Sequence, residues 1–148
     1  MAIIDWAALA KLKAEIGAEF PRILGYFRED GVRSIVAIED AMRARDAARV
    51  VRPAHTLKGE SAQFGAEPLR LLSEQIERGA RRCVETHDVP DELLEHVVQL
   101  RPLLQQTLAM LEAHAAPGGP TAPAPVLAPG VPRRPQGFGR KVGGFGRG

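Results

Sequence analysis

Apolar residues recur three or four positions apart through most of the chain, which is the spacing of amphipathic helices. Asp5 can cap a short first helix, in which one face is apolar at Trp6, Leu9, Leu12 and Ile16. Longer stripes follow and predict four helices at about residues 21–45, 46–64, 67–83 and 90–114. Pro102 lies inside the last range, where a proline can kink a helix.

These stripes predict an all-α protein. Four helices of this length with short connections favour an antiparallel four-helix bundle, with the short N-terminal helix laid across it. The periodicity ends near Ala115, and proline, glycine and alanine dominate the residues that follow. A segment of that composition buries too little apolar surface to fold. We therefore expect a helical domain over 1–116 and a disordered Pro/Gly/Arg-rich tail over 117–148.

The net charge of +2 conceals an uneven distribution. Residues 1–116 hold 15 basic and 18 acidic residues, a charge of −3, whereas the tail holds five basic residues and no acid. The basic character therefore belongs to the tail and does not indicate a nucleic-acid-binding domain. Two GFGR segments in the tail, at 137–140 and 144–147, could bind RNA or acidic surfaces weakly. A solubilising or partner-tethering tail is the simpler interpretation.

The sequence lacks the features of a membrane or secreted protein. No run approaches the roughly 18 apolar residues of a transmembrane helix, and the N-terminus has no secretory signal. We therefore expect a cytoplasmic protein, and a monomer because the bundle closes within one chain. Cys83 is the single cysteine, which excludes an intrachain disulfide.

The predicted helix over 46–64 carries the clearest chemical pattern. One of its faces is small and apolar and suits a core, at Ala54, Leu57, Ser61 and Phe64. His55 lies about 200° around the helix from Leu57, so it points outward. Lys58 and Gly59 follow His55 by three and four residues and share its face. The pattern places an imidazole, an ammonium group and uncovered backbone side by side.

This combination suits phosphoryl transfer between proteins. A neutral imidazole has a free ring nitrogen that can act as a nucleophile. Lys58 is placed to stabilise an anionic group on His55. A glycine inside a helix costs about 1 kcal/mol relative to alanine, so Gly59 suggests that something bulky must come close.

The residues around His55 resemble the histidine-containing phosphotransfer (HPt) domain of bacterial phosphorelays. The resemblance rests on Ala54-His55-Thr56-Leu57-Lys58-Gly59, followed by Phe64-Gly65-Ala66 and Leu69. It extends more loosely from about Asp5 to His114 and does not cover the tail. It implies a four-helix bundle that exposes His55 on its second helix. It also implies that a phosphoryl group moves between Nε2 of His55 and an aspartate on a receiver domain.

The resemblance further implies partners and roles. The partners would be receiver domains of response regulators and hybrid histidine kinases, docking at Arg52, Thr56, Gly59 and Ala62 beside the phosphorylated His55, with Lys58 stabilising the phosphoryl group. The metal ion for the reaction sits on the receiver, so we expect neither metal nor cofactor here. The protein would be a carrier without a kinase domain, and the phosphate-binding pattern GxxxxGK[ST] is absent.

Two positions outside this face also receive roles. An acidic or amide residue of the family often bonds the histidine ring from the position of Glu77, which would fix Nδ1 and leave Nε2 free. Alternatively, Glu77 is a solvated residue that pairs with Arg81 at i+4. Gly65 suits the left-handed cap that ends the helix over 46–64.

A second function, from another class, fits the same composition. The chain could be a non-catalytic helical adaptor that binds a partner through a groove or through the basic tail. Incubation with a phosphorylated receiver separates the two hypotheses, because only the first predicts phosphohistidine on this chain.

Overall fold

The structure is a computed structural model that describes residues 2–115. Within them it contains no strand, which confirms the all-α prediction. The helices are α1 (Trp6–Ile16), α2 (Phe20–Arg43), α3 (Ala48–Gln63), α4 (Glu67–Thr86), α5 (Leu94–Val97) and α6 (Leu100–Ala115), with 3-10 turns η1 (Gly17–Glu19) and η2 (Pro90–Leu93). The predicted disordered tail lies outside the described residues.

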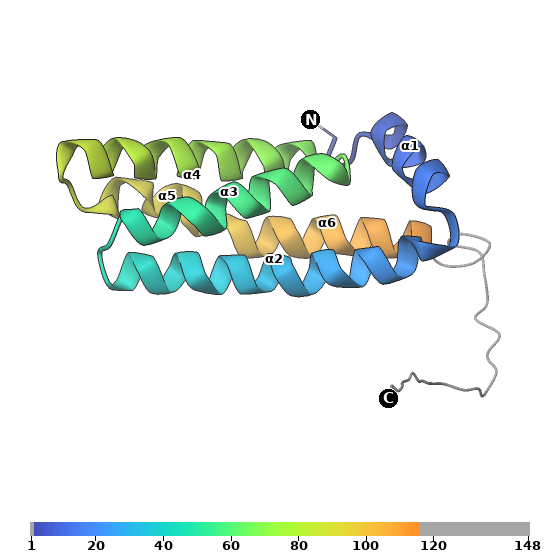
Figure 1. The fold of residues 1–148 in the computed structure, drawn as a ribbon, viewed down its shortest axis with the longest axis horizontal. Coiled ribbons are helices and arrows are strands. Elements are labelled where there is room, and N and C mark those ends of the chain that lie inside the picture. The colour runs from blue at the N-terminus through green and yellow to red at the C-terminus, as the bar shows by residue number, and fades with distance from the viewer. Residues whose placement is uncertain (1, 116–148) are drawn as a thin grey trace, which may run out of the picture. The chain divides into compact units, whose positions relative to one another are not determined.

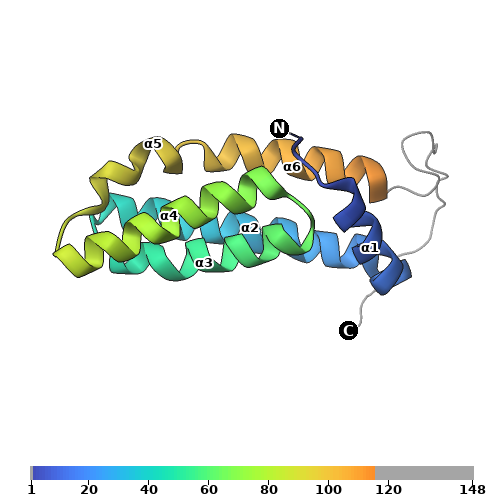
Figure 2. The ribbon, with the colours of Figure 1, turned by 90° about the horizontal axis from the view of Figure 1, so that it is seen from above.

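Four segments run lengthwise beside one another: α2, α3, α4 and the pair α5–α6 (Figure 1). Successive segments reverse direction, and α3 packs against both α2 and α4. Figure 2 shows α1 at one end of this bundle, set across its long axis. Buried aliphatic side chains from all four segments fill the core, together with Phe27 stacked on Phe64 at a centroid distance of 4.7 Å. The antiparallel four-helix bundle is therefore confirmed.

The prediction of one continuous helix over 90–114 is wrong. The chain forms η2 and α5 first and makes a turn at residues 98–99 before α6 begins. Pro102 explains the turn. It has no N–H to donate to the carbonyl of Val98, and its ring would clash with that carbonyl in a continuous helix. The proline therefore separates two helices instead of kinking one.

The connection between α3 and α4 turns at Gly65, whose φ is +71°. The Gly65 N–H donates to the Ala62 carbonyl at 3.1 Å, and the Ala66 N–H donates to the Ser61 carbonyl at 2.9 Å, which is the Schellman pattern. The Gly65 carbonyl also accepts from the Asp5 N–H at 2.7 Å. A Cβ on Gly65 would meet the Asp5 carbonyl oxygen at 2.8 Å. This glycine therefore ends α3 and lets the start of the chain close against it.

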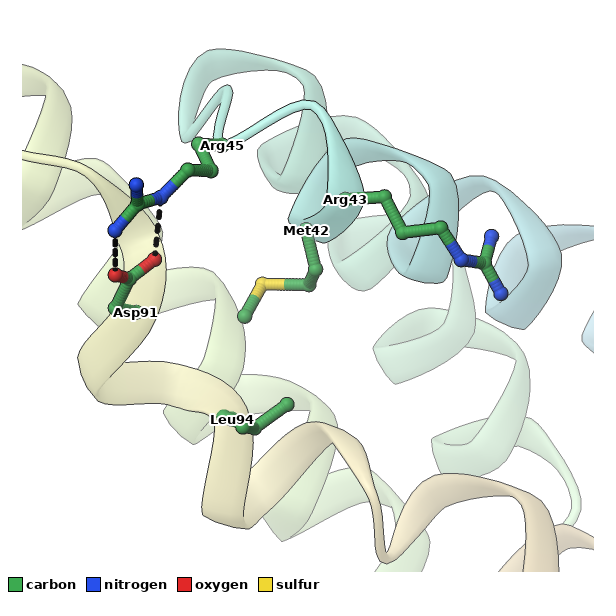
Figure 3. Close-up of a pocket in the computed structure, with 5 residues that line it drawn as sticks. All are labelled: Met42, Arg43, Arg45, Asp91 and Leu94. Atoms are coloured by element: carbon green, nitrogen blue, oxygen red, sulfur yellow. Dashed lines mark hydrogen bonds and ion pairs between the residues drawn. The ribbon is translucent and has the colours of Figure 1, made fainter.

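A hollow lies between the end of α2 and the η2–α5 segment (Figure 3). Arg45, at a φ of +55°, donates from Nε to Oδ1 of Asp91 at 3.2 Å and from Nη2 to Oδ2. This bonding lowers the pKa of the Asp91 carboxyl. Met42 and Leu94 supply the apolar lining, while Arg43 points away from the ion pair. The pair ties the turn after α2 to the segment that precedes α6.

Candidate functional site

Helix α3 places His55 on the side turned away from the core. Its predicted inward face is buried completely or almost so, at Ala54, Leu57, Ser61 and Phe64. The His55 side chain is 61% exposed. One helical period therefore serves both the packing of the bundle and the exposure of the imidazole.

The predicted docking positions surround His55 on exposed helix surface. Arg52, Thr56, Gly59 and Ala62 are all exposed. A Cβ added at Gly59 would meet no atom within 4 Å, so crowding inside the protein does not explain this glycine. The absence of a side chain leaves open space one helical turn from the imidazole.

Glu77 comes from the neighbouring helix α4, and its side chain is only 6% exposed. Nδ1 of His55 lies 3.0 Å from its Oε2. Arg81 donates to the same oxygen from Nε at 3.1 Å and from Nη2 at 2.8 Å. The two alternatives for Glu77, a bond to the histidine ring and a pair with Arg81, therefore occur together.

Lys58 reaches the same carboxylate from α3. Its Nζ lies 2.9 Å from Oε1 of Glu77, and its side chain is 29% exposed. Sequence reasoning placed Lys58 beside His55 but did not pair it with Glu77, which is 19 residues further along the chain. The structure thus joins His55, Lys58 and Arg81 through one carboxylate.

The surrounding groups keep this carboxylate ionised. Burial raises the pKa of Glu77, but the contacts with Lys58, Arg81 and His55 outweigh burial and lower it to about 2. An ionised carboxylate only accepts hydrogen bonds, so Nδ1 of His55 must be the donor in their contact. The neutral imidazole then carries its proton on Nδ1 and has its lone pair on Nε2.

A model of the Hpt domain family matches residues 22–114. This range includes α3 and α4 and with them His55, Lys58, Glu77 and Arg81. The chain belongs to the Hpt domain family. Comparisons with curated proteins and with solved structures each found no match. Hpt domains are phosphorelay carriers that interact with receiver domains, and they are not kinases. The match leaves out α1, which lies before it in the chain.

Next to the His55 face, this Hpt domain has a hollow that sequence reasoning missed. It lies between α3 and α4 and is lined by Ala48, Val51, Arg81, Val84 and Glu85. The sequence did contain a signal for it. Val51 precedes His55 by four residues and Val84 follows Glu77 by seven, so these valines share the helix faces of the two site residues. Val84 is 42% exposed, which leaves apolar surface beside the site.

Across residues 2–115, no three His, Cys, Asp or Glu side chains come together as a metal site. None of the helices there has the length and apolar character that crossing a bilayer requires.

The depressed pKa of Glu77 predicts how stability depends on pH. The pKa of Glu77 is about 2 in the folded state and near 4.5 for an ordinary glutamate, as in the unfolded chain. The stabilisation of the fold by the ionised Glu77 is therefore complete above about pH 4.5. It is lost as the pH falls from there through about 2. Glu77→Gln should therefore flatten the decline in the free energy of unfolding over this range. At pH 7 it should lower that free energy by about 1–2 kcal/mol.

Urea denaturation from pH 2 to pH 7 measures this effect. Glu74→Gln is the matched control, because Glu74 lies on the same helix and also pairs with two arginines, Arg70 and Arg78. A Glu77→Gln profile parallel to that of the wild type would contradict the proposed electrostatics.

Proposed function

We propose that His55 accepts a phosphoryl group from the aspartate of one receiver domain and passes it to the aspartate of another. The observation that carries this proposal is how the His55 imidazole is bonded and how far it is exposed. Its Nδ1 is bonded to a nearly buried carboxylate, and its side chain is mostly exposed. This arrangement orients the ring and leaves Nε2 as the nucleophilic atom.

The transfer follows from that tautomer. The Nε2 lone pair forms a bond to phosphorus as the bond from phosphorus to the aspartate oxygen breaks. The electron pair of the broken bond stays on the receiver carboxylate. No proton leaves the ring, because the Nδ1 hydrogen remains directed at Glu77, whose negative charge offsets the positive charge that develops on the imidazole. The reverse sequence delivers the group to the second receiver.

Lys58 supplies charge stabilisation in this proposal. Its ammonium group is held by the carboxylate that also bonds His55, so it lies near the ring that would carry the phosphoryl group. A compact cation on a flexible stem can turn toward phosphoryl oxygens without moving the helix. Positioning and charge stabilisation are the main requirements of phosphoryl transfer.

The receiver would dock over the exposed face of α3, at Arg52, Thr56, Gly59 and Ala62. The hollow with Val51 and Val84 adds apolar surface on the α4 side. Receivers of response regulators and hybrid histidine kinases are the partners that we expect, with the metal ion supplied by the receiver. The monomeric state, the cytoplasmic location and the lack of a cofactor remain predictions.

Substitution of the phosphoryl acceptor tests the proposal. His55→Gln should fold normally, because the side chain is mostly exposed, and it should take no label from a receiver phosphorylated with ³²P. The wild type should acquire label that is labile in acid and stable in base. His96→Gln is the control and should be labelled like the wild type.

Either of two outcomes would contradict this proposal. Label on His55→Gln equal to that on the wild type places the acceptor elsewhere. A wild type that takes no label from any receiver tested supports the alternative of a helical adaptor.

Gly59 generates a second prediction, because a side chain there would stand in the path of the receiver. Gly59→Ala should leave stability equal or raise it by up to about 1 kcal/mol, since alanine favours helix and the site is open. Gly59→Gln should also fold, but transfer from the receiver should fail. Stopped-flow or quenched transfer assays, with thermal unfolding alongside, measure both effects.

Gly25 provides the matched control for size. It lies in α2, and an added Cβ there also meets nothing within 4 Å. Gly25→Gln should therefore fold and transfer normally. If Gly59→Gln transferred like Gly25→Gln, the receiver would have to approach from another side.

A further inference from the structure

We propose that Arg81 is a positioning residue that keeps the Glu77 carboxylate in place when Lys58 leaves it for the phosphoryl group. The inference rests on the proposed function of His55. It assigns different tasks to the two cations that share Glu77: Lys58 moves to the phosphoryl group, and Arg81 stays.

The two oxygens of the Glu77 carboxylate have different partners, which supports this assignment. Oε2 accepts from His55 and from two N–H groups of Arg81, whereas Oε1 faces only Lys58 among the cations of the site. Departure of Lys58 would therefore leave all three hydrogen bonds at Oε2 intact. The carboxylate would keep the orientation that presents Nε2 of His55 outward.

The charges support the same conclusion. Glu77 is nearly buried, and a buried carboxylate without a cationic partner is strongly unfavourable. With Lys58 as its single cation, Glu77 would compete directly with a phosphoryl group, which carries a charge of about −1.5 to −2. Because Arg81 also neutralises the carboxylate, Lys58 can turn to the phosphoryl oxygens without leaving Glu77 uncompensated.

The two side chains also differ in how they are held. Arg81 pairs with Glu77 along one helix, at i+4 on α4, through two N–H groups in a planar fork. Lys58 comes from α3, three residues after His55, and makes one contact with rotatable donors. The lysine is therefore the cation that can follow the phosphoryl group.

The lifetime of the phosphohistidine tests this division without any receiver. Wild type, Arg81→Ala, Lys58→Ala and the double variant would be phosphorylated with phosphoramidate, a small donor that needs no docking surface. Arg81→Ala should shorten the lifetime by about two- to fivefold, the range of a partly exposed ion pair. In the Lys58→Ala background the same substitution should shorten the lifetime by a larger factor, because the nearly buried Glu77 carboxylate then keeps neither of its cations. Arg81→Lys should restore part of the lifetime.

Arg78→Ala is the matched control. Arg78 pairs with Glu74 at i+4 on the same helix at 2.8 Å, as Arg81 pairs with Glu77, and its guanidinium is not among the groups that pair with the Glu77 carboxylate. It should leave the phosphohistidine lifetime unchanged.

A spectroscopic readout separates positioning from general stability. In the wild type, the ¹⁵N resonance of the Lys58 ammonium should shift on phosphorylation, whereas in Arg81→Ala this shift should be reduced. Two results would overturn the role of Arg81 but leave the proposed function standing. One is a phosphohistidine lifetime in Arg81→Ala equal to that of the wild type, and the other is an equal relative loss of lifetime in the presence and absence of Lys58. A wild type that phosphoramidate does not label at His55 would overturn the proposed function together with the role of Arg81.

Discussion

The site depends on a single nearly buried carboxylate. Glu77 is contributed by α4, and so is Arg81, one of the two cations that neutralise it. The imidazole that Glu77 orients and the second cation, Lys58, come from α3. Burial alone would favour the protonated acid, and the neighbouring donors reverse that preference. The ionised state in turn fixes the tautomer of His55. The packing of α3 on α4 therefore has a direct chemical consequence, because it determines which ring nitrogen is free.

The helical period of α3 explains how one short segment serves two purposes. Its buried face, around Leu57, joins the helix to α2 and α4, and its outer face presents His55. Gly59 belongs to the outer face, where no neighbour requires a glycine. Gly65 is different, because its positive φ and its contact with Asp5 require a residue without a side chain. Of these two glycines of the motif, one is explained by folding, and for the other we propose the approach of a partner as the reason.

Most of the fold could be predicted from the sequence because apolar period and cap residues are local signals. The four segments and the short first helix follow from them. The break before α6 was missed because Pro102 was expected to kink a helix, and whether a proline kinks or ends a helix depends on what surrounds the carbonyl that it leaves unbonded. The hollow between α3 and α4 was missed because the spacing of Val51 and Val84 indicates only which helix faces they share, whereas a hollow also depends on the distance between the two helices, which no local pattern specifies.

The site was predicted in part for a related reason. Spacing placed Lys58 and Gly59 beside His55, since all three lie on one helix. The contact between Lys58 and Glu77 joins two helices, and the sequence gives no distance for it. The sequence offers bonding to His55 and pairing with Arg81 as alternatives for Glu77, but a carboxylate has about four acceptor positions and can do both.

The position of the phosphorus atom on the ring tests the central claim most directly. The protein, uniformly labelled with ¹⁵N, would be phosphorylated by a receiver and examined by ³¹P–¹⁵N correlation NMR. We predict a single phosphohistidine, with phosphorus bonded to Nε2 of His55 and hydrogen retained on Nδ1, because Glu77 occupies that side of the ring. Phosphorus on Nδ1, or on any other residue, would contradict the account.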